Sequence, residues 1–140
     1  MTEARVLVAG EAHGEVLVLD RPLGFWGGVD EQTGVIIDVH HPQQGEGLRG
    51  RVLVMSQPGG STAGPVTLAE TVRRGVGPVA VVLGEPDPGV VSALVVAREL
   101  YGINVPVVVV EPDVLAGLRT GASLRVTESG ALVPEGAPDG

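Results

Sequence analysis

The chain has 140 residues and a formal net charge of −8, and it contains no cysteine and no lysine. The missing thiolates exclude disulfides and any zinc or iron–sulfur site built from this chain's own cysteines, and the missing lysines exclude Schiff-base chemistry and a Walker-type phosphate lysine. The acidic balance argues against a nucleic-acid partner, because such binding rests on lysine and arginine neutralising phosphates.

The first fifty residues favour β-structure. Residues 5–9 and 15–19 are rich in valine and leucine and flank a short segment bounded by glycines, so we expect them to pair as a hairpin. A short strand is predicted at 35–38, after a turn. Residues 39–50 show no usable periodicity. We expect a long loop there that either has a function or wraps an edge of the sheet.

The sequence pattern changes after residue 50. Runs of apolar β-branched residues there alternate with segments whose apolar residues recur at helical spacing. Helices are predicted at 65–74, 88–101 and 112–118. Strands are predicted at 51–56, 79–83, 105–110, 123–127 and 131–133. The strands at 79–83 and 105–110 are continuously apolar, which is typical of strands covered on both faces.

This order of elements predicts an α/β domain of three layers, with a βαβαβ middle and a β-barrel-like part. We expect residues 1–134 to form a single domain and residues 135–140 to form a frayed tail rich in glycine, proline and acid. No apolar run approaches the roughly 20 residues that span a bilayer, and no leader pattern is visible. A cytoplasmic protein without a membrane partner is therefore expected.

The segment 58–64, Pro-Gly-Gly-Ser-Thr-Ala-Gly, places a hydroxyl between glycines at a predicted strand-to-helix junction. Glycines let a backbone approach a ligand closely, and a helix start offers unpaired N–H groups and the positive end of a dipole. From the local pattern alone, the favoured interpretation is a turn in which Ser61 or Thr62 caps the helix. A functional Ser61 is the alternative.

Other polar positions are weaker candidates. His40 and His41 are adjacent, so their side chains are expected to point to opposite sides and not to share a metal. His13 is expected in a turn, and Asp87 is expected to cap the helix that follows it. Arg73 and Arg74 are expected at a solvated helix end.

The aromatic pair at 25–26 is followed by Gly27 and Gly28, and such a segment serves either as a core plug or as the rim of a site or interface.

Several ordered stretches together resemble the small subunit of the aconitase X family, which corresponds to the swivelling domain of aconitase-like hydro-lyases. The motifs that carry the resemblance are Phe-Trp-Gly-Gly-Val-Asp at 25–30, Thr-Gly-Val-Ile-Ile-Asp at 33–38, His-Pro at 41–42 with Gly45 and Gly50, Val-Leu-Val at 52–54 and Gly-Ser-Thr-Ala-Gly at 60–64, Glu-Pro-Asp-Pro at 85–88, and Glu-Leu-Tyr-Gly-Ile-Asn-Val-Pro-Val-Val at 99–108. The resemblance covers most of residues 5–127.

The resemblance implies a swivelling β/β/α fold and the dehydration of a small hydroxy acid by a heteromer. It also implies a larger partner subunit that carries an iron–sulfur or iron centre, with no metal ligand and no cofactor in this chain. It assigns Ser61 as the residue that accepts the substrate's proton, with Gly60, Thr62, Gly64, Gly27 and Gly28 as substrate-binding residues. This chain departs from the family pattern by having Gly59 in place of a basic residue and Pro65 in place of a serine.

Among the substrates of the family, cis-3-hydroxy-L-proline is favoured over phosphomevalonate, since a phosphorylated substrate would favour a basic residue at position 59. A second class of function is a non-catalytic swivelling carrier or binding module with His41 as phosphoacceptor. A third is an interaction subunit that only stabilises its partner.

Overall fold

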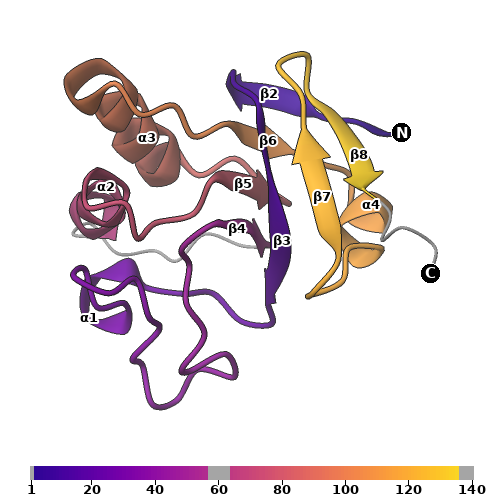
Figure 1. Cartoon of the computed structure of the whole chain (residues 1–140). Helices are drawn as coiled ribbons and strands as arrows, with labels where there is room; N and C mark the ends of the chain where they lie inside the picture. The colour runs from indigo at the N-terminus through magenta and orange to yellow at the C-terminus, as the bar shows by residue number, and fades with distance from the viewer. Residues whose placement is uncertain (1, 57–63, 136–140) are drawn as a thin grey trace.

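The computed structural model describes residues 2–56 and 64–135 of the chain. Its strands form one eight-stranded sheet in the order β1-β8-β7-β3-β4-β5-β6-β2 (Figure 1). The strands are β1 (Thr2–Glu3), β2 (Arg5–Val8), β3 (Ala12–Leu19), β4 (Arg51–Met55), β5 (Ala80–Leu83), β6 (Val107–Val109), β7 (Ser123–Val126) and β8 (Ala131–Glu135). The helices are α1 (Phe25–Gly28), α2 (Gly64–Arg73), α3 (Pro88–Tyr101) and α4 (Pro112–Ala116).

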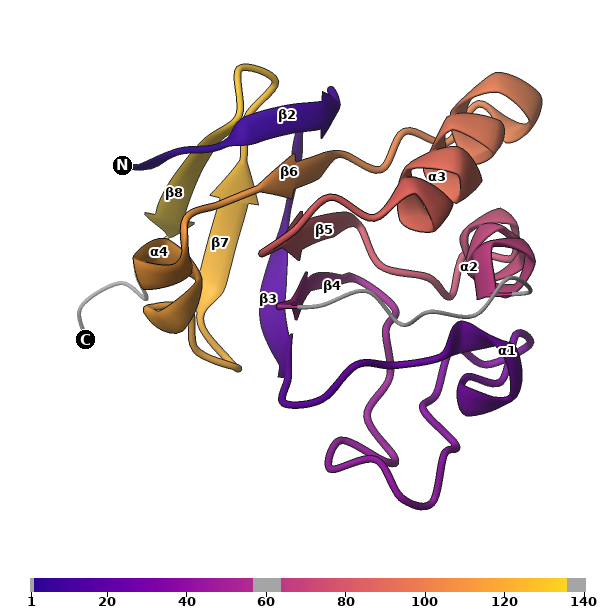
Figure 2. The same ribbon diagram turned by 180° about the vertical axis from the view of Figure 1, so that it is seen from behind.

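The centre of the sheet is parallel. β3, β4, β5 and β6 pair in parallel, and β4-α2-β5-α3-β6 is the predicted βαβαβ middle. Helices α1, α2 and α3 cover one face of these strands, whereas α4 lies on the other side of the sheet with the antiparallel strands (Figure 2). The predicted three-layer α/β architecture is confirmed.

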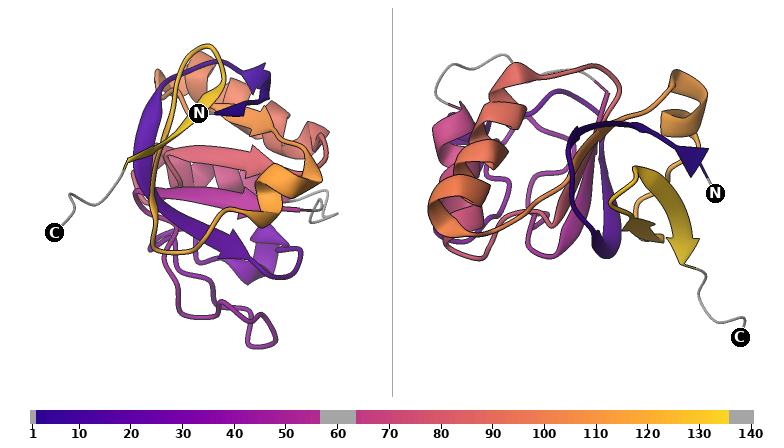
Figure 3. Two further views of the ribbon diagram at one scale, coloured as in Figure 1. Left: turned by 90° about the vertical axis from the view of Figure 1, so that its right-hand side faces the viewer. Right: turned by 90° about the horizontal axis from the view of Figure 1, so that it is seen from above.

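The sheet closes on itself through the N-terminal segment. β1 pairs with β8 and β2 pairs with β6, and only Ala4 separates these two short strands. One continuous segment thus covers both edges of the sheet, which removes the exposed edges that favour aggregation. The views in Figure 3 show the antiparallel strands curling away from the helix layer, and this is the predicted β-barrel-like part.

The predicted hairpin of residues 5–9 with 15–19 is wrong. β2 pairs with β6, while β3 lies between β4 and β7. The local pattern identified both strands correctly, but partners were decided by the closure of the sheet. The predicted strand at 35–38 is reduced to two isolated bridges, Val29 with Ile36 and Val35 with Gly47. β8 extends to Glu135, the first residue of the expected tail, and the rest of that tail lies outside the described residues.

Alternation along the strands separates two hydrophobic cores. In β4, Leu53 and Met55 pack toward the helices, while Val52 and Val54 face the inside of the barrel. The helix-side core contains most of the leucines with Phe25 and Ile36, and the barrel core is mainly valine and alanine. The predicted burial of both strand faces is therefore confirmed for the parallel strands, and it holds their ends in fixed positions.

Candidate functional site at the ends of the parallel strands

The loop with the highest-ranked sequence candidate follows β4. Gly60, Ser61 and Thr62 lie outside the described residues, so the assignment of Ser61 as proton acceptor, and the alternative of a helix cap, both remain predictions. The flanking positions are described. Ser56 directly follows β4 and is exposed, whereas Gly64 is buried as the first residue of α2.

A cavity of about 510 Å³ opens beside Ser56, between the ends of β3 and β4 and helix α4. Its floor is formed by side chains that also belong to the barrel core or pack on it, among them Val54 and Leu115. Its polar lining residues are Asp20, Ser56, Arg119 and Thr120. The cavity therefore lies at the carboxyl ends of parallel strands, where open α/β sheets bind ligands.

Asp20 is held at this edge by Gln43. The side-chain amide of Gln43 donates to Asp20 Oδ2 over 2.6 Å, and the main-chain N–H of Asp20 donates to Gln43 Oε1 over 3.0 Å. The long loop predicted at 39–50 is thus folded back onto the end of β3. These bonds attach the loop to the end of β3, a central strand, so they test neither of its two predicted roles.

His41 fixes that loop from inside. It is buried, with 6% of its surface exposed, and its Nδ1 accepts a hydrogen bond from the main-chain N–H of Gln43 at 3.0 Å. The other ring nitrogen, Nε2, lies 3.0 Å from the carbonyl oxygen of Arg21 and therefore carries the proton in this arrangement. His40 is exposed, so the predicted divergence of the two histidines is confirmed.

The burial of His41 has a consequence for the carrier hypothesis. A phosphoacceptor histidine needs an exposed nitrogen with a free lone pair, and both ring nitrogens of His41 are engaged. The buried His41 therefore does not fit the phosphoacceptor role, because its ring serves the packing of the loop.

Arg119 and Thr120 follow α4 at the opposite wall of the cavity. Arg119 Nη1 donates to the carbonyl oxygen of Ala116 over 2.7 Å, which places a cation at the C-terminal end of the helix. Among the described residues no carboxylate lies within ion-pair distance of Arg119. The Thr120 hydroxyl accepts from the main-chain N–H of Val18 at 2.9 Å. One cation and one carboxylate, Arg119 and Asp20, thus line the same cavity.

The two aromatic residues of the motif at 25–28 differ in burial, so only one of them is the predicted core plug. Phe25 is buried in the helix-side core as a plug, and Trp26 is 68% exposed. Gly27 is exposed and has a φ of 78°, while Gly28 is buried and its carbonyl oxygen accepts from the N–H of Ile37 at 2.8 Å. Neither glycine lines the cavity beside Ser56. Their assignment to substrate binding therefore remains a prediction that this cavity does not support.

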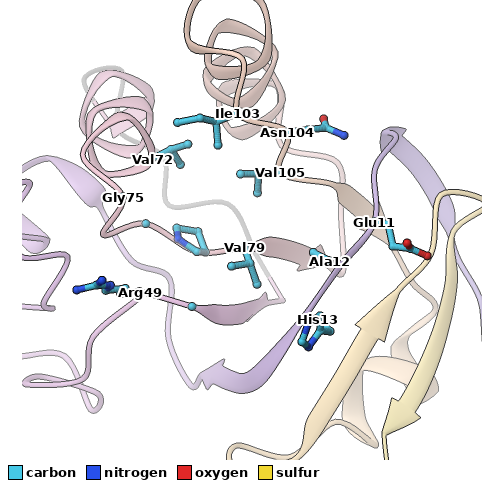
Figure 4. Close-up of a pocket in the computed structure, with 13 residues that line it drawn as sticks. Glu11, Ala12, His13, Arg49, Val72, Gly75, Val79, Ile103, Asn104 and Val105 are labelled. Atoms are coloured by element: carbon cyan, nitrogen blue, oxygen red, sulfur yellow. The ribbon is translucent and has the colours of Figure 1, made fainter.

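A second cavity of about 490 Å³ lies at the other ends of the same strands (Figure 4). The side chains toward its middle are apolar, including Val72, Val79 and Val105, while Arg49 and Glu11 lie at its sides. His13 also lines it and belongs to β3, so the predicted turn at this residue is wrong.

The remaining charged motifs stabilise helices. Asp87 caps α3 as predicted, since its Oδ1 accepts from the N–H groups of Gly89 at 3.0 Å and Val90 at 3.3 Å. Arg73 and Arg74 both bond Glu70, and the hydrogen bond from Arg73 is the main cause that lowers the pKa of Glu70 from 4.5 to about 2. The two arginines at this helix end are therefore paired as well as solvated.

Across residues 2–56 and 64–135, the structure brings together no group of three histidine, aspartate or glutamate side chains that fits a metal ion. Within the same ranges, no helix combines the length and the apolar character needed to cross a membrane.

Comparison with known proteins connects this geometry to a family. The family model described as aconitase X swivel domain matches residues 1–133. The chain belongs to this family. The crystal structure of Thermococcus kodakaraensis aconitase X in its holo form superposes on the swivel domain with a TM-score of 0.84 and 30% identity, covering 96% of this chain and 97% of that one. The predicted family and swivelling fold are confirmed.

The curated relatives of the swivel domain carry two names. The cis-3-hydroxy-L-proline dehydratase of Pseudomonas aeruginosa is 43% identical over 74% of this chain, and the match spans only 18% of that relative. The phosphomevalonate dehydratase small subunit of Thermococcus onnurineus is 30% identical over 94% of this chain and 95% of its own length. This chain therefore spans under a fifth of the first relative and nearly all of the second.

Reasoning from the sequence missed Asp20, Gln43, Arg119 and Thr120. A signal was present for Asp20, which directly follows a predicted strand, where sheet ligands are bound. Arg119 had no local signal, because it follows a short helix and reaches the cavity only through the folding of α4 against the barrel.

Proposed function

We propose that this chain is the small subunit of an aconitase X-type hydro-lyase, that it is inactive alone, and that it works with a separate large subunit. The family membership carries this proposal, together with relatives that are named dehydratases or dehydratase small subunits. A cavity at the carboxyl ends of the parallel strands, lined by Ser56, which precedes Ser61 by five residues, supports a place for the substrate on this chain.

In the proposed reaction Ser61 accepts a proton from the carbon next to the substrate carboxylate. The electron pair of that C–H bond forms a carbon–carbon double bond, and the C–O bond of the neighbouring hydroxyl group breaks. The departing hydroxide takes up a proton from solvent and leaves as water, and Ser61 returns its proton to solvent. An iron or iron–sulfur centre on the large subunit would act as a Lewis acid toward the departing hydroxyl. This chain has no cysteine, so cluster ligands that are thiolates must come from the partner.

A serine hydroxyl is a weak base, and it needs nearby donors to hold the alkoxide. We assign the N–H groups around Gly60 and Thr62, with the start of α2 at Gly64, to that task. Arg119 would bind the substrate carboxylate across the cavity, because a guanidinium matches the geometry of a carboxylate.

The favoured substrate is cis-3-hydroxy-L-proline, a zwitterion. Its carboxylate and its ring ammonium suit a cavity lined by one cation, Arg119, and one carboxylate, Asp20. The higher identity to the hydroxyproline relative supports the same choice. Phosphomevalonate is the alternative substrate, since the length of this chain fits the small subunits that act in that reaction. Its two anionic groups would meet a single arginine on this side of the site.

The test is to mix the purified chain with the large subunit of the same organism and to assay both substrates. We expect turnover of cis-3-hydroxy-L-proline only in the mixture. Exclusive turnover of phosphomevalonate would select the alternative substrate. Equal turnover by the large subunit alone would leave this chain with the stabilising role of an interaction subunit, and no turnover of either substrate would contradict the proposal.

A further inference from the structure

The exposed large apolar side chains of the described residues are confined to one side of the molecule. All seven lie on α1, α2 or α3 or in the segment that follows α1, and none lies on the strands or α4. They are Trp26, Ile37, Val39, Val66, Val96, Leu100 and Tyr101. Single exposed apolar residues are ordinary on protein surfaces, but their gathering on one layer marks an interaction surface.

Four of these residues lie on the outer surface of α2 and α3, which pack side by side (Figure 1). Between the two helices is a groove of about 240 Å³. We call it the α2–α3 groove, lined by Val66, Ala69 and Glu70 of α2 and by Ser92, Val96 and Tyr101 of α3. Val66 is 72% exposed, and Val96 and Tyr101 are each 39% exposed. This groove has room for an apolar anchor side chain of a partner, with hydroxyl groups at its rim.

The charge of this surface differs from that of the whole chain. α2 and α3 carry two arginines and two glutamates, and therefore no net charge, in a chain with a formal charge of −8. The one carboxylate in the groove, Glu70, is already bonded by Arg73 and Arg74. Burial of this face would therefore leave no unpaired charge at its centre. The cores of protein interfaces are likewise depleted of charged residues.

We propose that the α2–α3 groove is the surface through which this chain binds the large subunit of the dehydratase. This inference rests on the proposed function. The Pseudomonas aeruginosa relative holds the matching region within a chain more than five times longer, because the match is 18% of its length. The Thermococcus onnurineus small subunit is matched over 95% of its own length, so a subunit of that kind meets its partner through a surface and not through a covalent link. Pro65 lines the groove and follows Ser61 by four residues in the sequence, so a partner docked here meets the chain at a position next in sequence to the proposed catalytic segment.

The test measures binding of the purified large subunit from the same organism by titration calorimetry. Val66→Arg and Val96→Arg place a charge on the two walls of the groove. We expect each variant to raise the dissociation constant at least about 30-fold, as substitutions at interface hot spots do. Ser129→Arg is the control, because Ser129 is exposed in the turn between β7 and β8 and lies outside the groove. It should stay within about threefold of the wild type.

Unchanged binding by both groove variants, or an equal loss in Ser129→Arg, would overturn the assignment. Thermal unfolding of each variant checks that it is folded. Amide hydrogen exchange in the wild-type complex tests the proposal without a mutation. Protection from exchange should appear on α2 and α3, and its absence there contradicts the proposal. Binding that depends on the groove in a complex without dehydratase activity would refute the proposed function alone. A wild-type chain that does not bind the large subunit would refute both.

Discussion

The two ends of the parallel strands hold cavities of nearly equal size and different chemistry. At the carboxyl ends, a cavity of about 510 Å³ is lined by Asp20, Ser56, Arg119 and Thr120. At the amino ends, a cavity of about 490 Å³ is lined mainly by valines and glycines, and its charged residues lie only at its sides. Volume therefore does not distinguish a site from a structural hollow in this fold. What distinguishes the proposed site is its connection to a loop whose side chains are proposed to react.

The amino ends also bring backbone segments close together. A Cβ atom added at Gly14 of β3 would lie 2.3 Å from the carbonyl oxygen of Gly50. The Asn104 side-chain amide donates to the carbonyl oxygen of Ala9 over 3.0 Å and ties the segment before β6 to that before β3. We interpret this end as a structural closure and the other end as the reactive one.

The largest expected effect separates the two ends directly. Ser61→Ala should reduce kcat of the assembled dehydratase at least about 100-fold, because positioned proton transfer contributes about 10²–10⁴. His13→Ala, at the amino ends, should leave kcat unchanged. Steady-state kinetics with saturating large subunit measures both. Full activity of Ser61→Ala would remove the serine from the mechanism, and the loss of activity in His13→Ala would reverse the comparison.

A second test concerns the stability of the amino ends. Gly14→Ala should lower the free energy of unfolding of the isolated chain by about 1–3 kcal/mol, because the added methyl group overlaps main-chain atoms. Gly47→Ala is the matched control, since nothing lies within 4 Å of its added Cβ. Urea denaturation measures both. Equal stability of the two variants would show that this end of the sheet relaxes without cost.

A third test compares two arginines, one at each cavity. Arg119→Gln should raise KM about 10-fold with a smaller change in kcat, because it removes a charge-assisted bond to the substrate carboxylate. Arg49→Gln, which lines the other cavity, should leave both parameters unchanged. A fall in kcat with constant KM for Arg119→Gln would argue against ground-state binding by this residue.

The smallest effect lies away from both ends, on α2. The pKa of Glu70 is about 2 in the folded chain against 4.5 in the unfolded chain, so its contribution to stability is present above pH 4.5 and is lost as the pH falls toward 2. The difference in unfolding free energy between wild type and Glu70→Gln should thus be constant at neutral pH and vanish near pH 2. Urea melts at several pH values measure it. A difference that persists at pH 2 would exclude this ion pair as its cause.

Local patterns predicted the elements of the parallel half well. Helix α3 spans Pro88–Tyr101 as expected, because Asp87 caps its start and the left-handed Gly102 ends it. Local patterns did not predict the partner of a strand where the pairing is long-range. Residues 5–8 form a strand, but its partner is β6, about a hundred residues away, and nothing in an alternating pattern specifies a partner.

The candidate site divides in the same way. The hydroxyl and glycine pattern at 58–64 is a local signal that by itself favours a helix cap, and the resemblance to the family selected Ser61, which remains a prediction. Asp20, Gln43 and Arg119 are distant in sequence and meet at one edge only after the chain has folded.

The sequence by itself determined the family, the alternation of strands and helices, and the absence of thiolates and lysines, because each depends on residue type and local spacing. Only the tertiary structure decided that the sheet closes through its first strand, that His41 is a buried support and not an exposed acceptor, and that Asp20 and Arg119 line one cavity. These features depend on packing between segments far apart in the chain, and packing is set by which faces are buried together.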